Sequence, residues 1–268
     1  MTIAGSDCSG GAGVQADLKT FSALGVYGMS AVTAITAQNT LGVYDIMAVT
    51  PLVVGRQIDA VFDDIRPDAV KIGMLFNKEI IDVVADKLRE NSAVNVVLDP
   101  VMISTSGSCL LREDAIDSMI ERLFPIADII TPNRHEAEHI ASMKIESFAD
   151  MLMCGSRILD MGAGAVLIKG GHFDVDDMTD YLFAPGLIEP LKFTSRRVPS
   201  RNTHGTGCTL SSAIAAYLSL GYELVDAVGR AKEYLSNALS HGADIAIGGG
   251  HGPVNHFYEP HKLNIKQL

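Results

Sequence analysis

Short apolar runs alternate with longer amphipathic segments along this chain. Three runs are almost continuously apolar and end in Pro, Asn or Gly, at residues 96–100, 128–133 and 165–171. Such runs are typical of strands that are buried on both faces of a parallel sheet. Residues 112–124 and 147–162 instead carry apolar side chains at helical spacing. The alternation predicts an α/β fold, with a mostly parallel sheet and helices on both of its faces.

Two regions depart from this alternation. Residues 28–50 and 179–198 each look like consecutive strands without an intervening helix. They predict a small antiparallel edge or flap on the main sheet. Because the sequence contains no linker, low-complexity segment or internal repeat, we expect residues 1–268 to form a single domain.

Composition narrows the class of protein. Hydrophobic residues make up 47% of the 268 residues, enough for a substantial core, and the net charge of −11 disfavours nucleic acid as a partner. No stretch approaches the roughly 20 apolar residues of a membrane span, and the first residues do not resemble a secretory signal. The four cysteines lie far apart, as in a reduced protein. We therefore expect a soluble, cytoplasmic protein.

Polar residues mark where the predicted strands end. In open α/β sheets, ligands bind beyond the carboxyl ends of the strands, so these residues map the expected site. They are Asp7, Lys71, Asp99, Asn133, Lys169 and the turn at Gly205.

The segment "GTGC", from Gly205 to Cys208, precedes an apolar run that predicts a helix ending at Gly221. Glycines allow the backbone to approach a ligand closely, and the start of a helix attracts anions. The same helix start can lower the pKa of the Cys208 thiol and favour its thiolate. The alternative is a structural loop capped by Thr206. The spacing does not match a P-loop.

Other motifs leave two interpretations open. Asn133 and Glu136 lie three residues apart, which suits either Mg²⁺ binding or a helix capping box. Lys169 either neutralises phosphate or extends into solvent. The glycine cluster at residues 4–17 is either a turn or a loop that contacts the substrate. Taken together, these motifs indicate a phosphotransferase that uses a magnesium–nucleotide complex without a P-loop.

Several ordered motifs resemble one enzyme family. They include "TIAGSD", "QADLKTFSALG", "TAQNT", "KIGML", "VVLDPVM" and "NTHGTGCTLS". From Thr2 to about Phe257 the chain is similar to the bacterial hydroxymethylpyrimidine/phosphomethylpyrimidine kinases of thiamine biosynthesis, in the ribokinase superfamily. The resemblance implies a ribokinase-like fold, ATP and Mg²⁺ as cofactors, and a homodimer. It also implies phosphorylation of 4-amino-5-hydroxymethyl-2-methylpyrimidine and then of its monophosphate.

The resemblance also implies roles for individual residues. Cys208 corresponds to the catalytic base, or at least to the residue that orients the substrate hydroxyl, at a position that is aspartate in most ribokinase relatives. Together with Asp99 at the end of its strand, Glu136 is assigned to Mg²⁺. The pyrimidine-contacting positions are Gly5, Asp17, Gln38, Met74 and Val101. The positions that contact ATP or phosphate are Asn133, Lys169, Gly205, Thr206 and Gly207.

One departure and two alternatives accompany this assignment. Cys8 stands where the family usually has proline. A pyridoxal or pyridoxine kinase is the nearest alternative function, since its substrates also carry a hydroxymethyl and a methyl group. A catalytically inactive sensor is the other, and the intact set of Lys169, Glu136 and Cys208 argues against it.

Overall fold

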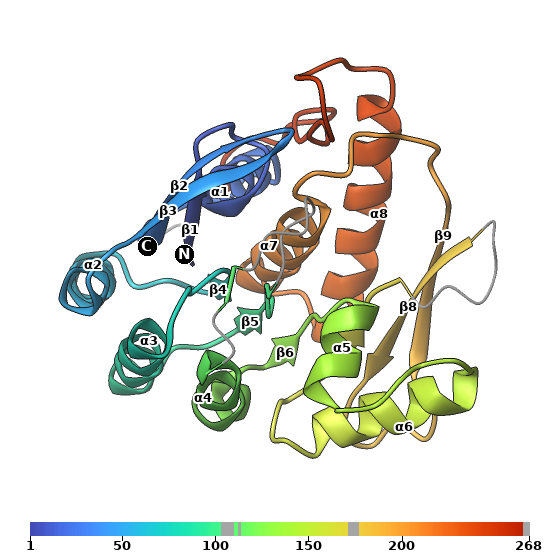
Figure 1. Cartoon of the computed structure of the whole chain (residues 1–268), viewed down its shortest axis with the longest axis horizontal. Coiled ribbons are helices and arrows are strands. Elements are labelled where there is room, and N and C mark those ends of the chain that lie inside the picture. The colour runs from blue at the N-terminus through green and yellow to red at the C-terminus, as the bar shows by residue number, and fades with distance from the viewer. Residues whose placement is uncertain (103–109, 112–113, 171–176, 265–268) are drawn as a thin grey trace.

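A computed structural model describes residues 1–102, 110–111, 114–170 and 177–264. Within these residues nine strands form one sheet, in the order β3-β2-β1-β4-β5-β6-β7-β8-β9 (Figure 1). The strands are β1 (Thr2–Asp7), β2 (Ser30–Asn39), β3 (Gly42–Ala48), β4 (Val70–Ile72), β5 (Val96–Leu98), β6 (Ile129–Ile130), β7 (Val166–Ile168), β8 (Asp177–Phe183) and β9 (Leu191–Arg196).

The sheet is parallel in its centre and antiparallel at both edges. Strands β2, β1, β4, β5, β6 and β7 run parallel to their neighbours in that order. Strand β3 pairs antiparallel with β2, and β8 and β9 extend the other edge as an antiparallel hairpin. The mostly parallel α/β fold is confirmed, and the two regions that lack an intervening helix form these two edges.

Helices cover both faces of the sheet (Figure 1). The chain contains α1 (Gly13–Ala23), α2 (Pro51–Asp64), α3 (Lys78–Glu90), α4 (Asp114–Arg122), α5 (Arg134–Ile140), α6 (Phe148–Leu159), α7 (Thr206–Ser219) and α8 (Leu224–Gly242). Helices α1, α7 and α8 contribute to one apolar cluster, whereas α2 to α6 contribute to the other.

The buried strands divide their side chains between these two clusters. Val97 of β5 packs with α7 and α8, whereas its neighbours Val96 and Leu98 pack on the opposite face. Leu167 of β7 is likewise separated from Val166 and Ile168. Successive strand residues point to opposite faces of the sheet. Because helices cover both faces, every position along these strands is buried and apolar. This explains the continuous apolar runs in the sequence.

Local chemistry sets where the helices begin and end. Ser147 and Asp150 form a reciprocal capping box at the start of α6. Of the helix expected over residues 112–124, the first two residues lie outside the described part, and α4 ends at Arg122. A short 3₁₀ turn, η1 (Phe124–Ile126), follows, because Pro125 cannot continue an α-helix. Among the described residues, no helix is long and apolar enough to cross a membrane.

Candidate active site

The glycine turn before α7 contacts the first glycine turn of the chain. Gly205 is the N-cap of α7 and has a φ of 80°, in the left-handed region that favours glycine. A Cβ at this position would overlap the carbonyl oxygen of Gly11. Thr206 does not cap the helix, since its hydroxyl donates to the carbonyl oxygen of Thr203 at 3.1 Å. Gly205 itself makes no side-chain capping bond to α7, so the alternative of a structural loop capped by Thr206 is unsupported.

An ion pair lies directly beside this turn. Asp99 follows β5, Lys169 follows β7, and Lys169 Nζ donates to Asp99 Oδ1 at 2.7 Å. A Cβ on Gly207 would lie 3.3 Å from Lys169 Nζ and 3.5 Å from Asp99 Oδ2. The structure therefore brings Gly205, Gly207, Lys169 and Asp99 together, as expected from the strand ends.

The charges of this ion pair are mutually stabilised. Burial alone would raise the pKa of Asp99, but Lys169 and Lys71 hold it below its ordinary value. Burial alone would lower the pKa of Lys169, and Asp99 and Glu136 raise it above its ordinary value. Thr131 Oγ1 also donates to Asp99 Oδ1 at 3.2 Å. Both side chains are thus charged before any ligand arrives.

Asn133 and Glu136 form a capping box at the start of α5. The Asn133 N–H donates to Glu136 Oε2 at 2.7 Å, and the Glu136 N–H donates to Asn133 Oδ1 at 2.9 Å. Glu136 is buried, and burial raises its pKa to about 7, with Lys169 opposing and Asp99 reinforcing the shift. Glu136 is therefore close enough to this ion pair for both of its charges to shift the Glu136 pKa. The cap and a ligand-binding role are compatible.

The expectation of a readily formed thiolate at Cys208 is wrong. Burial raises the pKa of the Cys208 thiol to about 11, although the positive charge of Lys71 opposes the shift. Asp17 and Asp99 add negative charge nearby and reinforce it. Desolvation and these carboxylates together outweigh the positive charge of Lys71. Cys208 is half-buried and remains a neutral thiol near pH 7.

Three of the expected pyrimidine-contacting residues lie together. Met74 and Val101 belong to one small apolar cluster with Ala34, separate from the two large cores. A Cβ on Gly5 would lie 2.9 Å from the Met74 sulfur. These residues form an apolar surface near the carboxyl ends of β1, β4 and β5.

Asp17 lies apart from that surface. Its carboxylate is fully buried and accepts from Lys71 Nζ at 2.9 and 3.0 Å, from Thr2 Oγ1 at 2.6 Å and from Ser212 Oγ at 2.7 Å. Lys71, expected at the open edge of the site, is also fully buried. The structure therefore places this pair beneath the site, where it joins β1, α1, β4 and α7.

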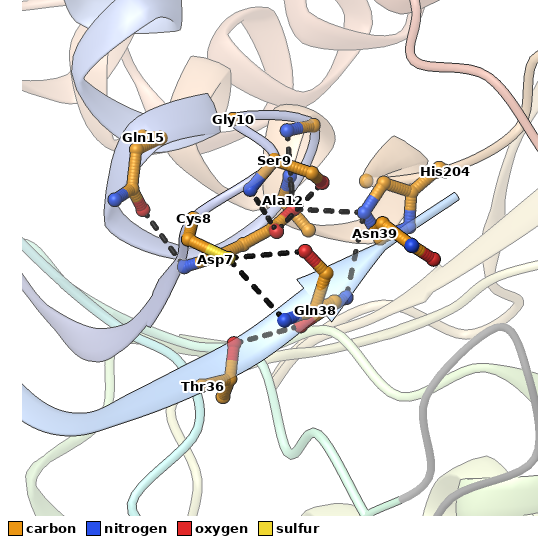
Figure 2. A network of polar contacts seen from close by, with 12 residues as sticks. Asp7, Cys8, Ser9, Gly10, Ala12, Gln15, Thr36, Gln38, Asn39 and His204 are labelled. Atoms are coloured by element: carbon orange, nitrogen blue, oxygen red, sulfur yellow. Dashed lines mark hydrogen bonds and ion pairs between the residues drawn. The ribbon is translucent and has the colours of Figure 1, made fainter. Parts of the chain in front are cut away.

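A further polar network surrounds Gln38 (Figure 2). Its amide nitrogen lies 3.5 Å from His204 Nε2, and His204 Nε2 lies 2.8 Å from Asp7 Oδ2. The exposed Cys8 thiol donates to the Gln38 carbonyl oxygen at 3.0 Å, so the cysteine holds the end of β2. Sequence reasoning gave His204 no role, because neither periodicity nor spacing distinguishes a paired histidine from a solvated one.

Two cavities lie in different parts of the fold. One, of about 260 Å³, is lined by His204, Gly11 and Asn39, next to this polar network. The other, of about 320 Å³, is lined by Phe21, Ala69 and other residues near the amino ends of the strands. The first cavity adjoins the site, and the second does not.

Comparison with known proteins identifies the family. The family model described as phosphomethylpyrimidine kinase matches residues 7–255. The chain belongs to the phosphomethylpyrimidine kinase family. A hydroxymethylpyrimidine/phosphomethylpyrimidine kinase from Rhizobium meliloti (strain 1021) is 49% identical over 259 residues, 96% of each chain.

Solved structures agree with this assignment. The crystal structure of a phosphomethylpyrimidine kinase from Clostridium difficile 630 is 48% identical, has a TM-score of 0.77, and is matched over 89% of this chain and 97% of its own. A pyridoxal kinase from Staphylococcus aureus, in complex with AMP-PCP and pyridoxal, has a TM-score of 0.86 but is only 36% identical, with coverage of 96% and 92%. The phosphomethylpyrimidine kinase interpretation, including its kinase class and ribokinase-like fold, is confirmed over the pyridoxal kinase alternative.

Proposed function

We propose that this site transfers the terminal phosphoryl group of ATP to the hydroxymethyl oxygen of 4-amino-5-hydroxymethyl-2-methylpyrimidine, and then phosphorylates the monophosphate. The observation that carries this proposal is the ion pair of Asp99 and Lys169 beside Gly207. It sets a cation and a glycine-rich helix start side by side, which is the arrangement that holds a transferring phosphate. The AMP-PCP bound by the pyridoxal kinase relative supports ATP as the donor.

Lys169 and the start of α7 would neutralise the negative charge of the phosphate. The lysine is 15% exposed, so its ammonium group is partly dehydrated yet reachable. Charge–charge interactions strengthen where water is excluded. Phosphoryl transfer passes through a loose transition state, in which positioning and charge neutralisation supply most of the rate enhancement. The backbone can approach the phosphate at Gly205, Thr206 and Gly207. Asn133 caps the start of α5 beside it.

The acidic residues fit a magnesium ion that is bound mostly by phosphate and water. Within the described ranges no group of three or more His, Cys, Asp or Glu side chains forms a dedicated metal cage. Mg²⁺ commonly binds one or two carboxylates together with substrate phosphates. Glu136 and Asp99 are two such carboxylates, close enough that Asp99 raises the pKa of Glu136. When bound, the ion would neutralise phosphate charge, and Glu136 would hold it through its carboxylate.

Cys208 orients the substrate hydroxyl in this proposal. Because its pKa is raised to about 11, the thiol is not a strong base at rest. The loose transition state demands little early deprotonation, so a hydrogen bond that aims the hydroxyl oxygen at the phosphate is sufficient. Such a role needs the position of the sulfur more than its charge.

The pyrimidine is proposed to lie against the apolar surface formed by Gly5, Met74 and Val101. Gln38 lies at the end of β2, and its side-chain amide offers both a donor and an acceptor to the aminopyrimidine edge. Asp17 contributes indirectly, since its buried carboxylate fixes Lys71 and Ser212 below the site.

The assembly and location of the protein are further proposals. Exposed apolar side chains gather on β2, β3 and the start of α2, including Ile35, Met47 and Leu52. Ile35 and Met47 are cross-strand partners near the sheet edge, which supports a homodimer through this face. A single domain over residues 1–268, supported by the one sheet of the described residues, and a cytoplasmic location both stay predictions.

A coupled assay of ATP turnover tests the proposed function. Purified protein should consume ATP with Mg²⁺ when given hydroxymethylpyrimidine or its monophosphate. Gln38→Ala should raise the KM for the pyrimidine far more than the KM for ATP, because losing one such contact typically costs about 1–3 kcal/mol. Turnover with pyridoxal while both pyrimidines remain unused would contradict the proposal.

A further inference from the structure

His204 links the two glycine turns to the end of β2. Its side chain is buried, and its Nε2 atom lies 2.8 Å from Asp7 Oδ2 (Figure 2). A Cβ on Gly11 would overlap the His204 ring, so the ring is wedged against the first glycine turn. The same Nε2 atom lies 3.5 Å from the amide nitrogen of Gln38. The ring therefore stands between a carboxylate and the side chain proposed to read the pyrimidine.

The Asp7 carboxylate determines where the hydrogen on His204 lies. Asp7 Oδ1 accepts from the Ser9 N–H and hydroxyl, and Oδ2 accepts from the N–H groups of Gly11 and Ala12. Burial alone would raise the pKa of Asp7, but the hydrogen bonds from His204, Ser9 and Ala12 lower it to about 2. A charged carboxylate only accepts hydrogen bonds. His204 Nε2 must therefore carry a hydrogen and direct it at Asp7.

This hydrogen places the Gln38 amide in a conflict. An amide nitrogen only donates, so Gln38 Nε2 and His204 Nε2 face each other as two donors. At the other end, Thr36 Oγ1 has one hydrogen but lies 2.8 Å from the Ser6 carbonyl oxygen and 3.1 Å from Gln38 Oε1. If Thr36 donates this hydrogen to the nearer Ser6 oxygen, Thr36 Oγ1 and Gln38 Oε1 face each other as two acceptors.

Rotating the Gln38 amide by half a turn removes both conflicts. Its oxygen then lies beside the His204 Nε2–H, which stays directed at Asp7, so that two donors no longer face each other, and its nitrogen donates to Thr36 Oγ1. A carbonyl oxygen has a second lone pair, which stays available to a ligand. The amide oxygen therefore belongs on the His204 side.

We propose that His204, held by Asp7, is a specificity-determining positioning residue that fixes the Gln38 amide with its oxygen towards the ligand's neighbouring ring substituent. This inference rests on the proposed role of Gln38 in the substrate site. In hydroxymethylpyrimidine the substituent beside the hydroxymethyl group is an amino group, which donates. In pyridoxal the corresponding substituent is a formyl group, which only accepts. The orientation thus favours the aminopyrimidine and opposes pyridoxal.

Asp7→Ala removes the acceptor of the His204 hydrogen without removing the histidine. The hydrogen of the neutral ring can then move to Nδ1, and His204 Nε2 becomes an acceptor for Gln38 Nε2–H. The measured quantity is the ratio of kcat/KM for hydroxymethylpyrimidine to kcat/KM for pyridoxal. We expect this ratio to fall by about tenfold or more, because a mismatched hydrogen-bonding group discriminates strongly. The KM for ATP should stay within about twofold, since neither the ion pair beside Gly207 nor the α7 start changes.

If Asp7→Ala fails to fold, His204→Leu and His204→Gln provide a second test. Leucine removes the donor and should lower the same ratio. Glutamine can still donate to Asp7 and should restore part of it. Ser9→Ala is the matched control, since the Ser9 hydroxyl donates to Asp7 Oδ1 at 2.7 Å without contacting His204, and it should leave the ratio unchanged.

Two results separate the failure of this inference from the failure of the proposed site. If Gln38→Ala leaves the pyrimidine KM unchanged, Gln38 is not at the substrate site and the proposed function must be revised. If Gln38→Ala raises that KM while the folded His204 and Asp7 variants keep the wild-type ratio, His204 only joins the two turns and this inference is wrong. If the His204 and Asp7 variants lose kcat/KM equally for hydroxymethylpyrimidine, pyridoxal and ATP, this inference is also wrong.

Discussion

Lys71 Nζ donates to both carboxylate oxygens of Asp17, at 2.9 and 3.0 Å, and neither side chain is exposed to solvent. The two residues belong to β4 and α1, and Ser212 of α7 donates to the same carboxylate. Burial alone would lower the pKa of Lys71, but Asp17 raises it above its ordinary value. With Thr2 of β1, which also donates to Asp17, the pair connects four elements beneath the site.

Lys71→Met should destabilise the protein strongly, because it leaves the Asp17 charge buried without its cation. Removing one partner of a buried pair typically costs about 3–5 kcal/mol. Lys71→Met combined with Asp17→Asn should cost less than the sum of the two single changes, since the uncompensated charge is gone. Urea denaturation of the three variants measures this coupling, and additive losses would show that the pair is not an energetic unit.

Cys208→Ala should lose most of the turnover while ATP still binds, because the hydroxyl is no longer aimed at the phosphate. Cys208→Asp should restore a fraction, since a carboxylate can accept the same hydrogen bond. Steady-state turnover and nucleotide titration measure the two effects separately. An alanine variant as fast as the wild type would leave Cys208 without a catalytic role.

The raised pKa of Cys208 predicts slow alkylation. The thiolate is the reactive form, so the rate at Cys208 should increase about tenfold for each pH unit until the pH approaches its pKa of about 11. Iodoacetamide labelling followed by peptide mass spectrometry gives this rate, with the exposed Cys8 as the accessible comparison. Rapid labelling of Cys208 already at pH 7 would mean that the start of α7 does stabilise its thiolate.

Glu136→Gln separates capping from metal binding. Glutamine still accepts a hydrogen bond at this position of a capping box, so the Tm should change little. Turnover should fall by orders of magnitude if the carboxylate positions Mg²⁺. Asp150→Asn, in the matching capping box of α6, is the control and should keep full turnover. Full activity of Glu136→Gln at saturating Mg²⁺ would leave only the cap.

His256 should make stability depend on pH. Its Nε2 atom lies 3.1 Å from Thr209 Oγ1, whose hydroxyl donates to the carbonyl oxygen of Gly205. Burial lowers the pKa of His256 from 6.5 to about 4, and the charge of Lys19 adds to the shift. Above pH 6.5 the ring is neutral whether the chain is folded or not. Between pH 6.5 and about 4 only the unfolded chain takes up the proton, so folding stability falls with decreasing pH.

The free energy of unfolding that is lost through His256 is about 3 kcal/mol when the change is complete. His256→Gln should lose this contribution, seen as the difference between its unfolding free energy and that of the wild type from pH 8 to pH 4. Comparing the two proteins cancels the opposite contribution of Glu136, whose pKa is raised to about 7. His135→Gln, at a side chain that is 91% exposed, is the control. An unchanged slope in His256→Gln would show that another group titrates.

The sequence was most informative where the periodicity was strong. Continuous apolar runs predicted the buried strands because both sheet faces are covered, and the polar residues after them predicted the meeting of Asp99 with Lys169. The edges were predicted only as an antiparallel edge or flap. Pairing of β3 with β2 and of β8 with β7 depends on contacts between segments, which no local pattern records.

Side-chain environment could not be predicted in the same way. The sequence does not distinguish a strand-end lysine that is partly exposed, such as Lys169, from one that is fully buried, such as Lys71. The pKa of Cys208 depended on desolvation and on Asp17, which is distant in sequence. The start of a helix predicted the opposite direction, because sequence alone did not show how much water the site excludes.

The contact between Asp7 and His204 joins residues 197 positions apart, so it sets the order of events during synthesis. A ribosome adds about 5–20 residues per second, so roughly 10–40 seconds separate the emergence of these two side chains. Until α7 emerges, the first glycine turn lacks the histidine that pairs with its carboxylate. A nascent chain that stops before residue 204 can thus form part of the sheet but not the complete site.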